Sequence, residues 1–259
     1  MLWLYNFPDI FVTLFFIVVT LIAMKVIHGL IHQFFKHLIP EGGHSLGTHI
    51  HESIILLTSL VLTFSLIQVL DTNNSLEKLI SNEASQINNL DRLLLRSGEP
   101  KAQALRPGLL AYTKSIVEKE WPALIEGHED LDTRKSIIPV SRGIIQLEPR
   151  TPRETQLYSQ MLNLLEDIAQ SREERIEYAG AKLPIIYWYV IVLAFLTKLF
   201  VSSLLERSRL SSWVLAAQMT ALSAMMSLVF IFDRPFLGES GIQPGPLKHL
   251  IHTMENRTQ

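Results

Sequence analysis

One short segment carries the spacing of a catalytic serine. Residues 43–47 read GHSLG, which matches the G-x-S-x-G pattern of the nucleophile elbow in α/β-hydrolases. That elbow needs a buried strand before the serine and a helix directly after it, so that a strained turn raises the serine out of a parallel sheet. Here the segment lies between two long apolar stretches, and the chain lacks strand-like alternation. We therefore interpret it as a turn punctuated by glycine, and we expect no enzymatic activity.

Histidines are concentrated in the same part of the chain. His28 and His32 lie one helical turn apart, so their imidazoles could share a face and bind a transition metal, although no HExxH pattern accompanies them. The cluster could instead respond to pH, or simply lie at a membrane interface. We favour interfacial histidines and expect no metal and no cofactor. Six of the nine histidines belong to this cluster: His28, His32, His37, His44, His49 and His51.

Polar residues also interrupt the apolar segment at 53–70. Glu52 precedes it, Gln68 lies near its far end, and hydroxyl residues lie between them. A membrane helix must turn such residues towards protein or water, because lipid offers them no hydrogen-bond partner. The apolar residues between them could narrow a water-filled path. The candidate pathway residues are Glu52, Leu56, Ser59, Leu60, Thr63, Leu66 and Gln68.

A second stripe of small and hydroxyl residues follows the apolar segment at 210–232. Small residues at helical spacing let two membrane helices approach closely, which is the interpretation we favour. A water-filled lining is the alternative, because hydroxyl groups can also face a pathway. The stripe consists of Ser212, Ala216, Thr220, Ser223 and Ser227.

These residues lie in a chain with the composition of a membrane protein. Of its 259 residues, 48% are hydrophobic and 19% are charged, against roughly a quarter charged in soluble domains. Four segments are long enough to cross a hydrocarbon core of roughly 30 Å. Two of them carry no charge, and the other two qualify if Lys25 and Lys198 reach the interface with their ammonium groups. The predicted spans are residues 10–29, 53–70, 183–205 and 210–232.

Net charge and cysteine content exclude other classes of protein. The formal net charge is −2, whereas nucleic-acid binders concentrate Lys and Arg to neutralise phosphates, so we expect no nucleic-acid partner. The chain has no cysteine, which excludes disulfides and thiolate catalysis.

The polar region between the second and third spans, residues 72–182, has apolar residues at helical spacing. Their recurrence predicts amphipathic helices around 76–94 and 157–168. Because a module of this size can leave apolar faces uncovered, we expect these faces, with Trp121, to take part in self-association.

The centre of this polar region is less regular. A third helix is predicted at 108–125, and we expect it to break where Pro122 follows Trp121, because the residue before a proline is biased away from the helical region. The charged, proline-bearing stretch 126–152 is expected to be a loop.

The tail after the last span is rich in proline and glycine, which predicts a structured but irregular backbone. It could cover the mouth of a vestibule or act as a strap docked on the middle region, and we favour the strap. A short amphipathic helix follows, which we place at the membrane surface. The tail residues that stand out are Asp233, Arg234, Pro235, Phe236, Gly238, Pro244 and Pro246.

Together these patterns predict an all-α polytopic membrane protein. Four transmembrane helices form two hairpins, and an extramembrane helical region lies between spans two and three. The expected parts are an N-terminal hairpin at 1–71, the extramembrane region at 72–182, a C-terminal hairpin at 183–232 and the tail at 233–259.

Several segments together resemble one family. They read EASQINNLDRLLL at 83–95, YTKSIVEKEWPALIEG at 112–127, SREERIEYAGAKLPIIYW at 171–188 and FDRPFLGESGIQPGPL at 232–247. In this order they resemble the bestrophin-like bacterial membrane family catalogued as domain of unknown function 4239. The resemblance implies a four-span bacterial membrane protein distantly similar to bestrophins, which are homopentameric anion channels, and implies no established activity. Family members carry an arginine-rich run after the first span, whereas this chain has lysine and histidine at 25–37.

Cationic residues in the short segments predict the orientation in the membrane. The two hairpin turns, with the lysine-bearing span ends beside them, contain five Lys or Arg residues. The C-terminal tail contains three. We therefore expect the hairpin turns in the cytoplasm, with both termini and the middle region outside, the opposite of the bestrophin arrangement. The five are Lys25, Lys36, Lys198, Arg207 and Arg209, and the three are Arg234, Lys248 and Arg257.

Two functions remain open. The chain could form a homo-oligomeric ion channel in a bacterial inner membrane, each copy contributing one polar-striped helix to a central path. It could instead be a non-conducting membrane assembly whose extramembrane helices bind a partner. In both cases the expected partners are the lipid bilayer and further copies of the chain. The channel would also bind ions.

Overall fold

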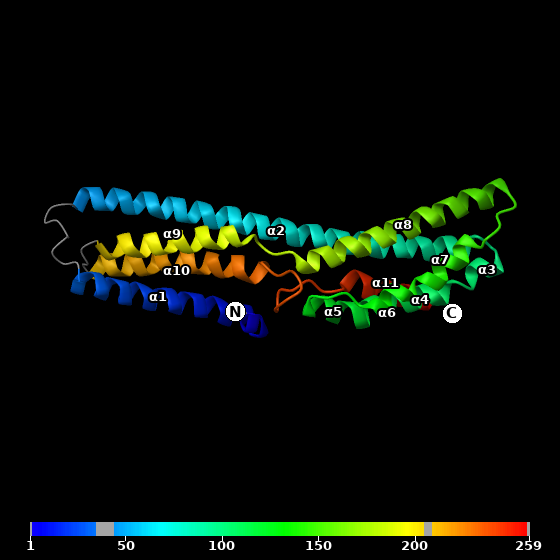
Figure 1. Ribbon diagram of the computed structural model, residues 1–259, viewed down its shortest axis with the longest axis horizontal. Helices are drawn as coiled ribbons and strands as arrows, with labels where there is room; N and C mark the ends of the chain where they lie inside the picture. The colour runs from blue at the N-terminus through cyan, green and yellow to red at the C-terminus, as the bar shows by residue number, and fades with distance from the viewer. Residues whose placement is uncertain (1, 35–43, 205–208, 258–259) are drawn as a thin grey trace. The chain divides into compact units, whose positions relative to one another are not determined.

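The computed structural model describes residues 2–34, 44–204 and 209–257, and every regular element among them is a helix (Figure 1). The all-α prediction is confirmed. The elements are η1 (Leu2–Asn6), α1 (Asp9–Phe34), α2 (His44–Arg96), α3 (Pro100–Gln103), α4 (Arg106–Ser115), the π-helix η3 (Ile116–Glu120), α5 (Trp121–Glu126), α6 (Leu131–Ser136), α7 (Ile138–Ile145), α8 (Pro152–Gly180), α9 (Ile185–Leu204), α10 (Arg209–Phe232) and α11 (Gly245–Asn256).

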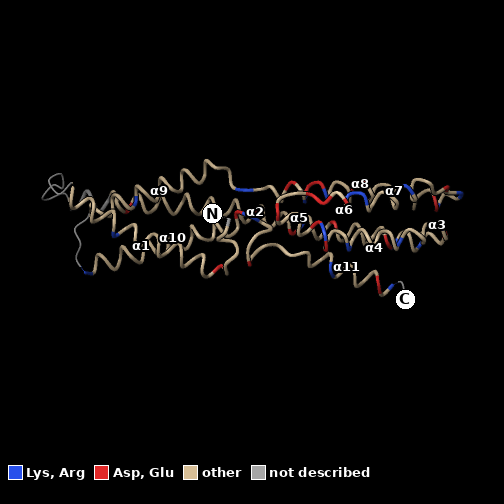
Figure 2. Tube along the Cα trace, turned by 60° about the horizontal axis from the view of Figure 1, so that its bottom comes forward, with Lys and Arg blue, Asp and Glu red and all other residues tan. Residues whose placement is uncertain are grey.

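The chain divides into two compact units. The first comprises residues 1–71 and 182–241, and the second comprises residues 72–181 and 242–259. Positions of Lys, Arg, Asp and Glu are sparse along the trace of α1, α9 and α10 and frequent along α4 and α8 (Figure 2). The two units are therefore built from sequences of different polarity.

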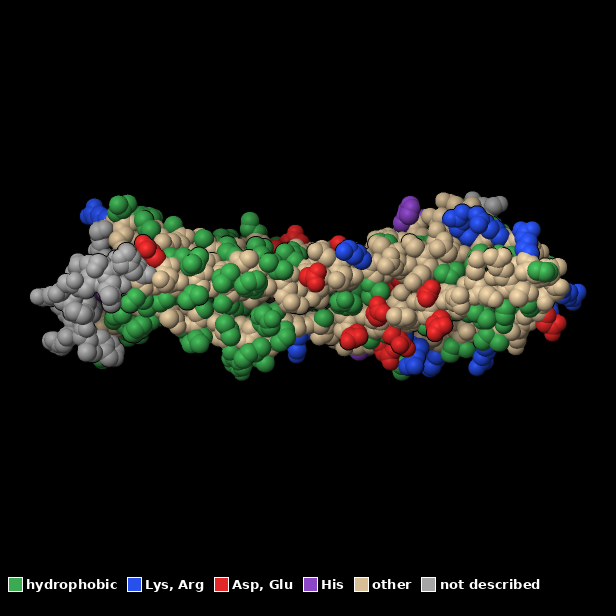
Figure 3. All heavy atoms as spheres, turned by 90° about the horizontal axis from the view of Figure 1, so that it is seen from above, with side chains coloured by type: hydrophobic (Ala, Val, Ile, Leu, Met, Phe, Trp, Pro, Cys, Tyr) green, Lys and Arg blue, Asp and Glu red, His purple; other side chains and the backbone are tan. Residues whose placement is uncertain are grey.

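The first unit contains the membrane-length helices. Four helical segments of the described chain are long and apolar enough to span a membrane. They contain the predicted spans 10–29, 53–70 and 210–232, and the predicted span 183–205 as far as Leu204. Helix α1 packs against α9 and α10, and a small core joins α2, α9 and α10 through Leu62, Ile191 and Val229. Large apolar side chains remain on the outside of these helices, including Leu56, at 70% exposure, and Leu193, at 65% (Figure 3). Such an outer surface is stable against lipid or against further protein.

Helix α2 is longer than predicted. It runs without interruption from His44 to Arg96, so the predicted span at 53–70 and the predicted amphipathic helix at 76–94 are parts of one helix. No glycine or proline occurs between Gly47 and Gly98, so nothing in the backbone chemistry ends the helix in between.

The second unit buries its own apolar faces. Helix α2 contributes Ile80 and Ile87, each 0% exposed, and α8 contributes Ile168, at 1%. Trp121 is 4% exposed. The expectation that these faces remain free for self-association is therefore wrong, because the short helices at 100–145 cover them. The other core residues of this unit include Leu76, Leu90, Leu94, Leu109, Ile116, Val140, Ile144 and Met161.

The centre of the second unit also differs from the prediction. The helix does not break at Pro122: α4 passes through the π-helix η3 into α5, with Pro122 in the first turn of α5. The stretch 126–152 is not a loop, because it holds α6 and α7. Burial of Thr133, Val140 and Ile144 against neighbouring helices stabilises these short elements, which local sequence signals do not reveal.

The last helix belongs to the second unit. α11 packs on α4 and buries Leu247, Leu250 and Met254, so these apolar residues face protein rather than a membrane surface. Lys114 Nζ lies 2.6 Å from Glu255 Oε1 and joins the two helices at the surface. The expectation that the apolar face of this helix lies on the membrane surface is therefore wrong.

Candidate permeation pathway

Helix α2 has one face that packs into the first unit and an opposite face that is exposed. Leu62, at 0% exposure, and Val69, at 3%, point into the core with α9 and α10. Leu56 is 70% exposed and Leu60 is 49% exposed, so they lie on the opposite face. Glu52, Thr63 and Gln68 are also exposed, and Ser59 and Leu66 are half-buried at the edge of this outer face.

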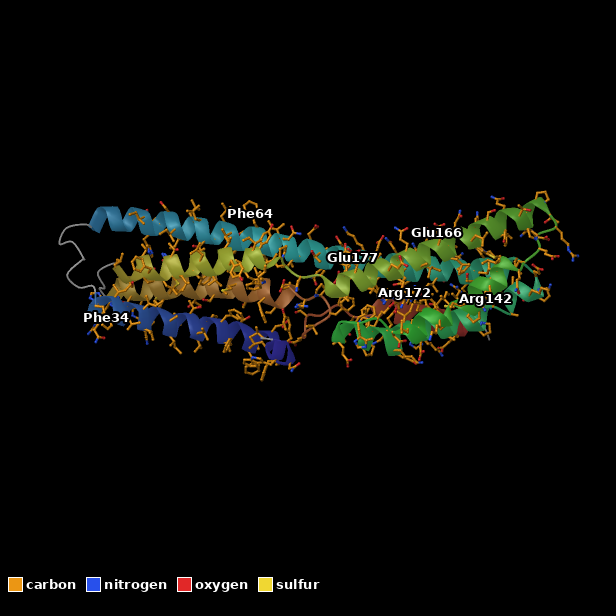
Figure 4. The ribbon with its side chains drawn as sticks, in the orientation of Figure 1. Phe34, Phe64, Arg142, Glu166, Arg172 and Glu177 are labelled. Atoms are coloured by element: carbon orange, nitrogen blue, oxygen red, sulfur yellow. The ribbon has the colours of Figure 1, made fainter. Side chains whose placement is uncertain are left out.

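The sequence analysis missed three large apolar residues that are exposed on α2 within 53–70: Leu57, Phe64 and Ile67. Phe64 is 60% exposed and lies one turn from Leu60 on α2, where Figure 4 labels it. Of the three leucines predicted to narrow a path, Leu66 turns partly towards the bundle, whereas Phe64 projects outward. Only the contacts of α2 with α9 and α10 set this rotation about the helix axis.

The hydroxyl groups on α2 are bonded within the helix. Ser59 Oγ donates to the carbonyl oxygen of Ile55 at 2.8 Å, and Thr63 Oγ1 donates to that of Ser59 at 2.8 Å. Each hydroxyl oxygen keeps lone pairs that can accept a hydrogen bond or contact a cation. The outer face of α2 therefore offers acceptors and a carboxylate, separated by apolar side chains.

The stripe on α10 lies mostly against protein. Ser223 and Ser227 are 0% exposed, and Ser227 Oγ donates to Thr13 Oγ1 of α1 at 3.1 Å. Ser212, Ala216 and Thr220 are half-buried. This arrangement suits close packing of α10 against its neighbours better than a lining shared between copies.

The tail after α10 is held at the ends of α1 and α9. Asp233 Oδ1 accepts a hydrogen bond from the backbone N–H of Leu183 at 2.5 Å, and Ser240 Oγ donates to Asp9. Asp9 N–H donates to Glu239 Oε2 at 3.0 Å. Within the first unit, the tail therefore straps the start of α1 to the end of α10.

The individual tail residues take different positions. Pro235 and Phe236 are buried, and Arg234 is half-buried. Gly238 has φ of +84°, a left-handed conformation that side chains with a Cβ rarely adopt. Pro244 is the N-cap of α11, and Pro246 is exposed.

The histidine pair forms a contact but no larger group. The rings of His28 and His32 have centroids 4.4 Å apart, and His28 Nδ1 lies 3.2 Å from the carbonyl oxygen of Ser203. In the part of the chain that the structure describes, no three potential metal ligands come together. His37 lies outside the described residues, as does Gly43, the first residue of the GHSLG segment.

A buried charge network lies in the second unit, and the sequence analysis did not find it. Arg175 on α8 binds Glu83 on α2 through two hydrogen bonds, of 2.8 Å and 3.1 Å, and binds Glu120 on η3 at 2.8 Å. Arg172, which Figure 4 labels on α8, bonds the other oxygen of Glu120. Glu83, Glu120 and Arg175 are 0% exposed.

The electrostatics of this network follow from its burial. The two carboxylates raise the pKa of Arg175 further above its ordinary value, despite the opposing effect of burial. Burial also raises the pKa of Tyr112, which lies beside these charges. A signal was present in the sequence: Glu83 interrupts the apolar face of its helix, between Ile80 and Ile87.

A second, smaller network ties the C-terminus to α2. Arg106 Nε donates to Asp91 Oδ1 at 2.7 Å, and Arg257 donates to Asp91 Oδ2 at 3.1 Å. Asp91 is 0% exposed. Glu83, Asp91, Glu120 and Arg175 all lie in the segments on which the family resemblance rests.

The Bestrophin-like domain profile matches residues 16–247, which include the outer face of α2, both charge networks except Arg257, and the tail motif. The chain belongs to the Bestrophin-like family. No protein with curated function matches it by sequence.

Solved structures share the fold of this Bestrophin-like chain. A bacterial bestrophin homologue from Klebsiella pneumoniae superimposes with a TM-score of 0.67 at 14% identity, over 94% of this chain and 96% of that chain. A mutant of that homologue superimposes with a TM-score of 0.67 at 13% identity, again over 94% of this chain and 96% of that chain. A crystal structure of a membrane protein variant gives 0.67 at 15% identity, also over 94% and 96%. At these identities the likeness establishes the fold.

Proposed function

We propose that this Bestrophin-like membrane protein forms a homo-oligomeric ion-conducting pathway, lined by the outer face of α2. The observation that carries the proposal is that this exposed face alternates polar and large apolar residues. Glu52 is exposed on α2, and a carboxylate at a membrane boundary is costly next to lipid but favourable beside a hydrated path between copies. Family membership supports the proposal, since bestrophins are ion channels.

Oligomerisation follows from the number of helices. Four membrane-length helices are too few to enclose a wide path within one chain. A path then requires several copies around an axis, each presenting the same helix. Helix α2 is preferred over α10, because Ser223 and Ser227 are buried against the chain itself.

The residues of α2 have distinct roles in this proposal. Leu56, Leu60 and Phe64 form the apolar constriction, which gates by excluding water. Glu52 places a ring of carboxylates at one mouth, which favours cations, whereas the bestrophin resemblance implies anions. The proposal therefore leaves the permeant ion open.

The location follows from composition and family. We place the protein in the bacterial inner membrane, with hairpin turns in the cytoplasm as the cation count predicts. The narrower assignment to domain of unknown function 4239 rests on the tail motif that begins at Asp233.

Planar bilayers containing the purified protein test the conduction proposal. Wild type should give unitary currents, Glu52→Gln should change the cation-to-anion permeability ratio, and Thr63→Leu should lower the conductance. Ser223→Ala is the matched control, because it removes a hydroxyl from the packed face of α10 and should leave currents unchanged.

The absence of currents at every pH and voltage, or currents insensitive to both α2 substitutions, would favour the alternative. In that case the helices only pack, and the extramembrane unit with its buried charge network is the working part.

A further inference from the structure

A fully buried lysine lies among the helices of the first unit. Lys198 on α9 is 0% exposed, and its Nζ lies 2.8 Å from Nε2 and 3.0 Å from Nδ1 of His51 on α2. His51 Nε2 lies 3.1 Å from Oε1 of Gln218 on α10. The expectation that Lys198 reaches the membrane interface is therefore wrong, because its ammonium group turns into a polar cluster between three helices.

The hydrogen-bond pattern leaves donors to spare. An imidazole offers at most one lone-pair nitrogen, so His51 accepts at most one hydrogen bond from Lys198. An ammonium group has three N–H donors, and no other acceptor contacts Nζ within the described ranges. At least one donor of Lys198 is thus available for another group.

The charge of Lys198 is not balanced by a carboxylate. In the described part of the chain, no acidic side chain lies within ion-pair distance of Nζ, and its hydrogen-bond contacts are to the ring of His51. Glu52 follows His51 in sequence but lies on the exposed side of α2. A buried ammonium ion requires a counter-charge or a strongly polar environment to remain charged.

A neighbouring hydroxyl group is also unsatisfied. Ser202 lies one turn along α9 from Lys198, is 0% exposed, and its Oγ has no hydrogen-bond partner. The adjacent Ser203 shows the usual alternative, since its Oγ donates to the carbonyl oxygen of Phe200 at 2.6 Å. A buried hydroxyl without a partner is unusual and calls for an acceptor beside it.

We propose that Lys198 and Ser202 bind a small inorganic anion of the halide class between α9, α2 and α10, with His51 positioning the ammonium group of Lys198. A halide carries one negative charge, which matches the single charge of Lys198, and it accepts several hydrogen bonds at once. Phosphate fits less well, because it carries more charge and more acceptor atoms than these donors can satisfy. The site lies on the buried side of α2, away from Leu56 and Leu60, so it is separate from the proposed path.

Thermal unfolding of the purified full-length protein in detergent tests the proposal at constant ionic strength and pH. Chloride or bromide in place of gluconate should raise the Tm saturably, by roughly 3–6 °C at ten times the dissociation constant. Lys198→Met should abolish the difference between bromide and gluconate. Ser202→Ala should raise the dissociation constant for bromide roughly tenfold, as expected for one charge-assisted hydrogen bond.

Two further variants complete the design. Ser203→Ala is the matched control and should keep the full bromide response, because the hydroxyl of Ser203 is already bonded to the backbone. Gln218→Glu places a carboxylate beside the cluster and should make stability independent of halide, which remains testable if Lys198→Met does not fold.

Three outcomes would overturn the site. They are equal Tm values in bromide and gluconate, a bromide response that survives Lys198→Met, and stability that follows pH alone, which would mean a neutral lysine. The site lies within one protomer, so binding does not depend on conduction. Currents with no bromide response would refute the site alone, and a bromide response without currents would refute the proposed pathway alone.

Discussion

At the scale of single residues, the charged side chains of the second unit's buried network are paired at hydrogen-bond distance. Arg175 lies between Glu83 and Glu120, and its guanidinium lies 5.9 Å from the ring centroid of Trp121. A complete buried ion pair stabilises a fold little more than apolar residues of the same volume. Removing one partner is different, because it leaves charges buried without compensation.

We therefore predict that Arg175→Met lowers the free energy of unfolding by about 3–5 kcal/mol. The measurement is chemical denaturation in detergent, followed by the fluorescence of Trp121 and the other tryptophans. The double variant Glu83→Gln with Arg175→Met should recover part of the loss, because one orphaned charge is gone.

The control for this prediction is Lys114→Met. It breaks the ion pair with Glu255, in which both side chains are 39% exposed, and should leave the free energy of unfolding close to that of the wild type, because solvent screens exposed ion pairs. Equal effects of Arg175→Met and Lys114→Met would contradict the prediction that the buried network contributes more to stability than an exposed ion pair.

At the scale of elements, short helices in the second unit depend on their end groups. Asp130 is the N-cap of α6 and accepts hydrogen bonds from the N–H of Thr133 at 2.7 Å and from its hydroxyl at 2.6 Å. These bonds hold the pKa of Asp130 below its ordinary value, with the hydroxyl bond the larger cause. The charged carboxylate therefore stabilises the start of α6, and contacts with neighbouring helices stabilise the remainder of the helix.

This cap predicts a pH-dependent effect of Asp130→Asn. Because the pKa of Asp130 is lower in the folded state, its charge contributes stability above the unfolded pKa of about 3.9, and that contribution is lost as pH falls through the folded value. At pH 7 we expect Asp130→Asn to lower the free energy of unfolding by roughly 0.5–1 kcal/mol, since asparagine can still cap the helix. Denaturation at pH 7 and pH 3 should show this difference shrinking at pH 3, and a constant difference would refute the electrostatic account.

At the scale of the whole molecule, orientation in the membrane is the main prediction. The cation count places the hairpin turns in the cytoplasm, although Lys36 and Arg207, two of the five residues counted, lie outside the described residues. The bestrophin resemblance implies the reverse, so a direct measurement is decisive between them.

We predict that single cysteines at Ser45 and Ser208 resist a membrane-impermeant maleimide in intact cells, whereas a cysteine at Ser136 reacts. The chain has no native cysteine, so each label reports one position. Ser136 is half-buried at the end of α6, and Ser208 lies outside the described residues. Labelling after cell lysis is the control, and the opposite pattern would reverse the orientation and favour the bestrophin arrangement.

The sequence by itself determined the class of fold and the number of membrane-length helices. Hydropathy and helical periodicity are properties of consecutive residues, so the spans and the helical character of the middle region follow from local patterns. The outer face of α2 was predicted in part for the same reason: Leu56, Leu60 and Thr63 recur at helical spacing.

Only the tertiary structure decided which side of each helix faces protein and which charges meet. Arg175 and Glu83 are 92 residues apart in the chain, so no local pattern could pair them. Lys198 turns inward because α2 and α10 surround it, and Phe64 turns outward because α2 packs through Leu62. Helices α6 and α7 exist because neighbouring helices bury one side of each, and in short elements such contacts outweigh local propensity.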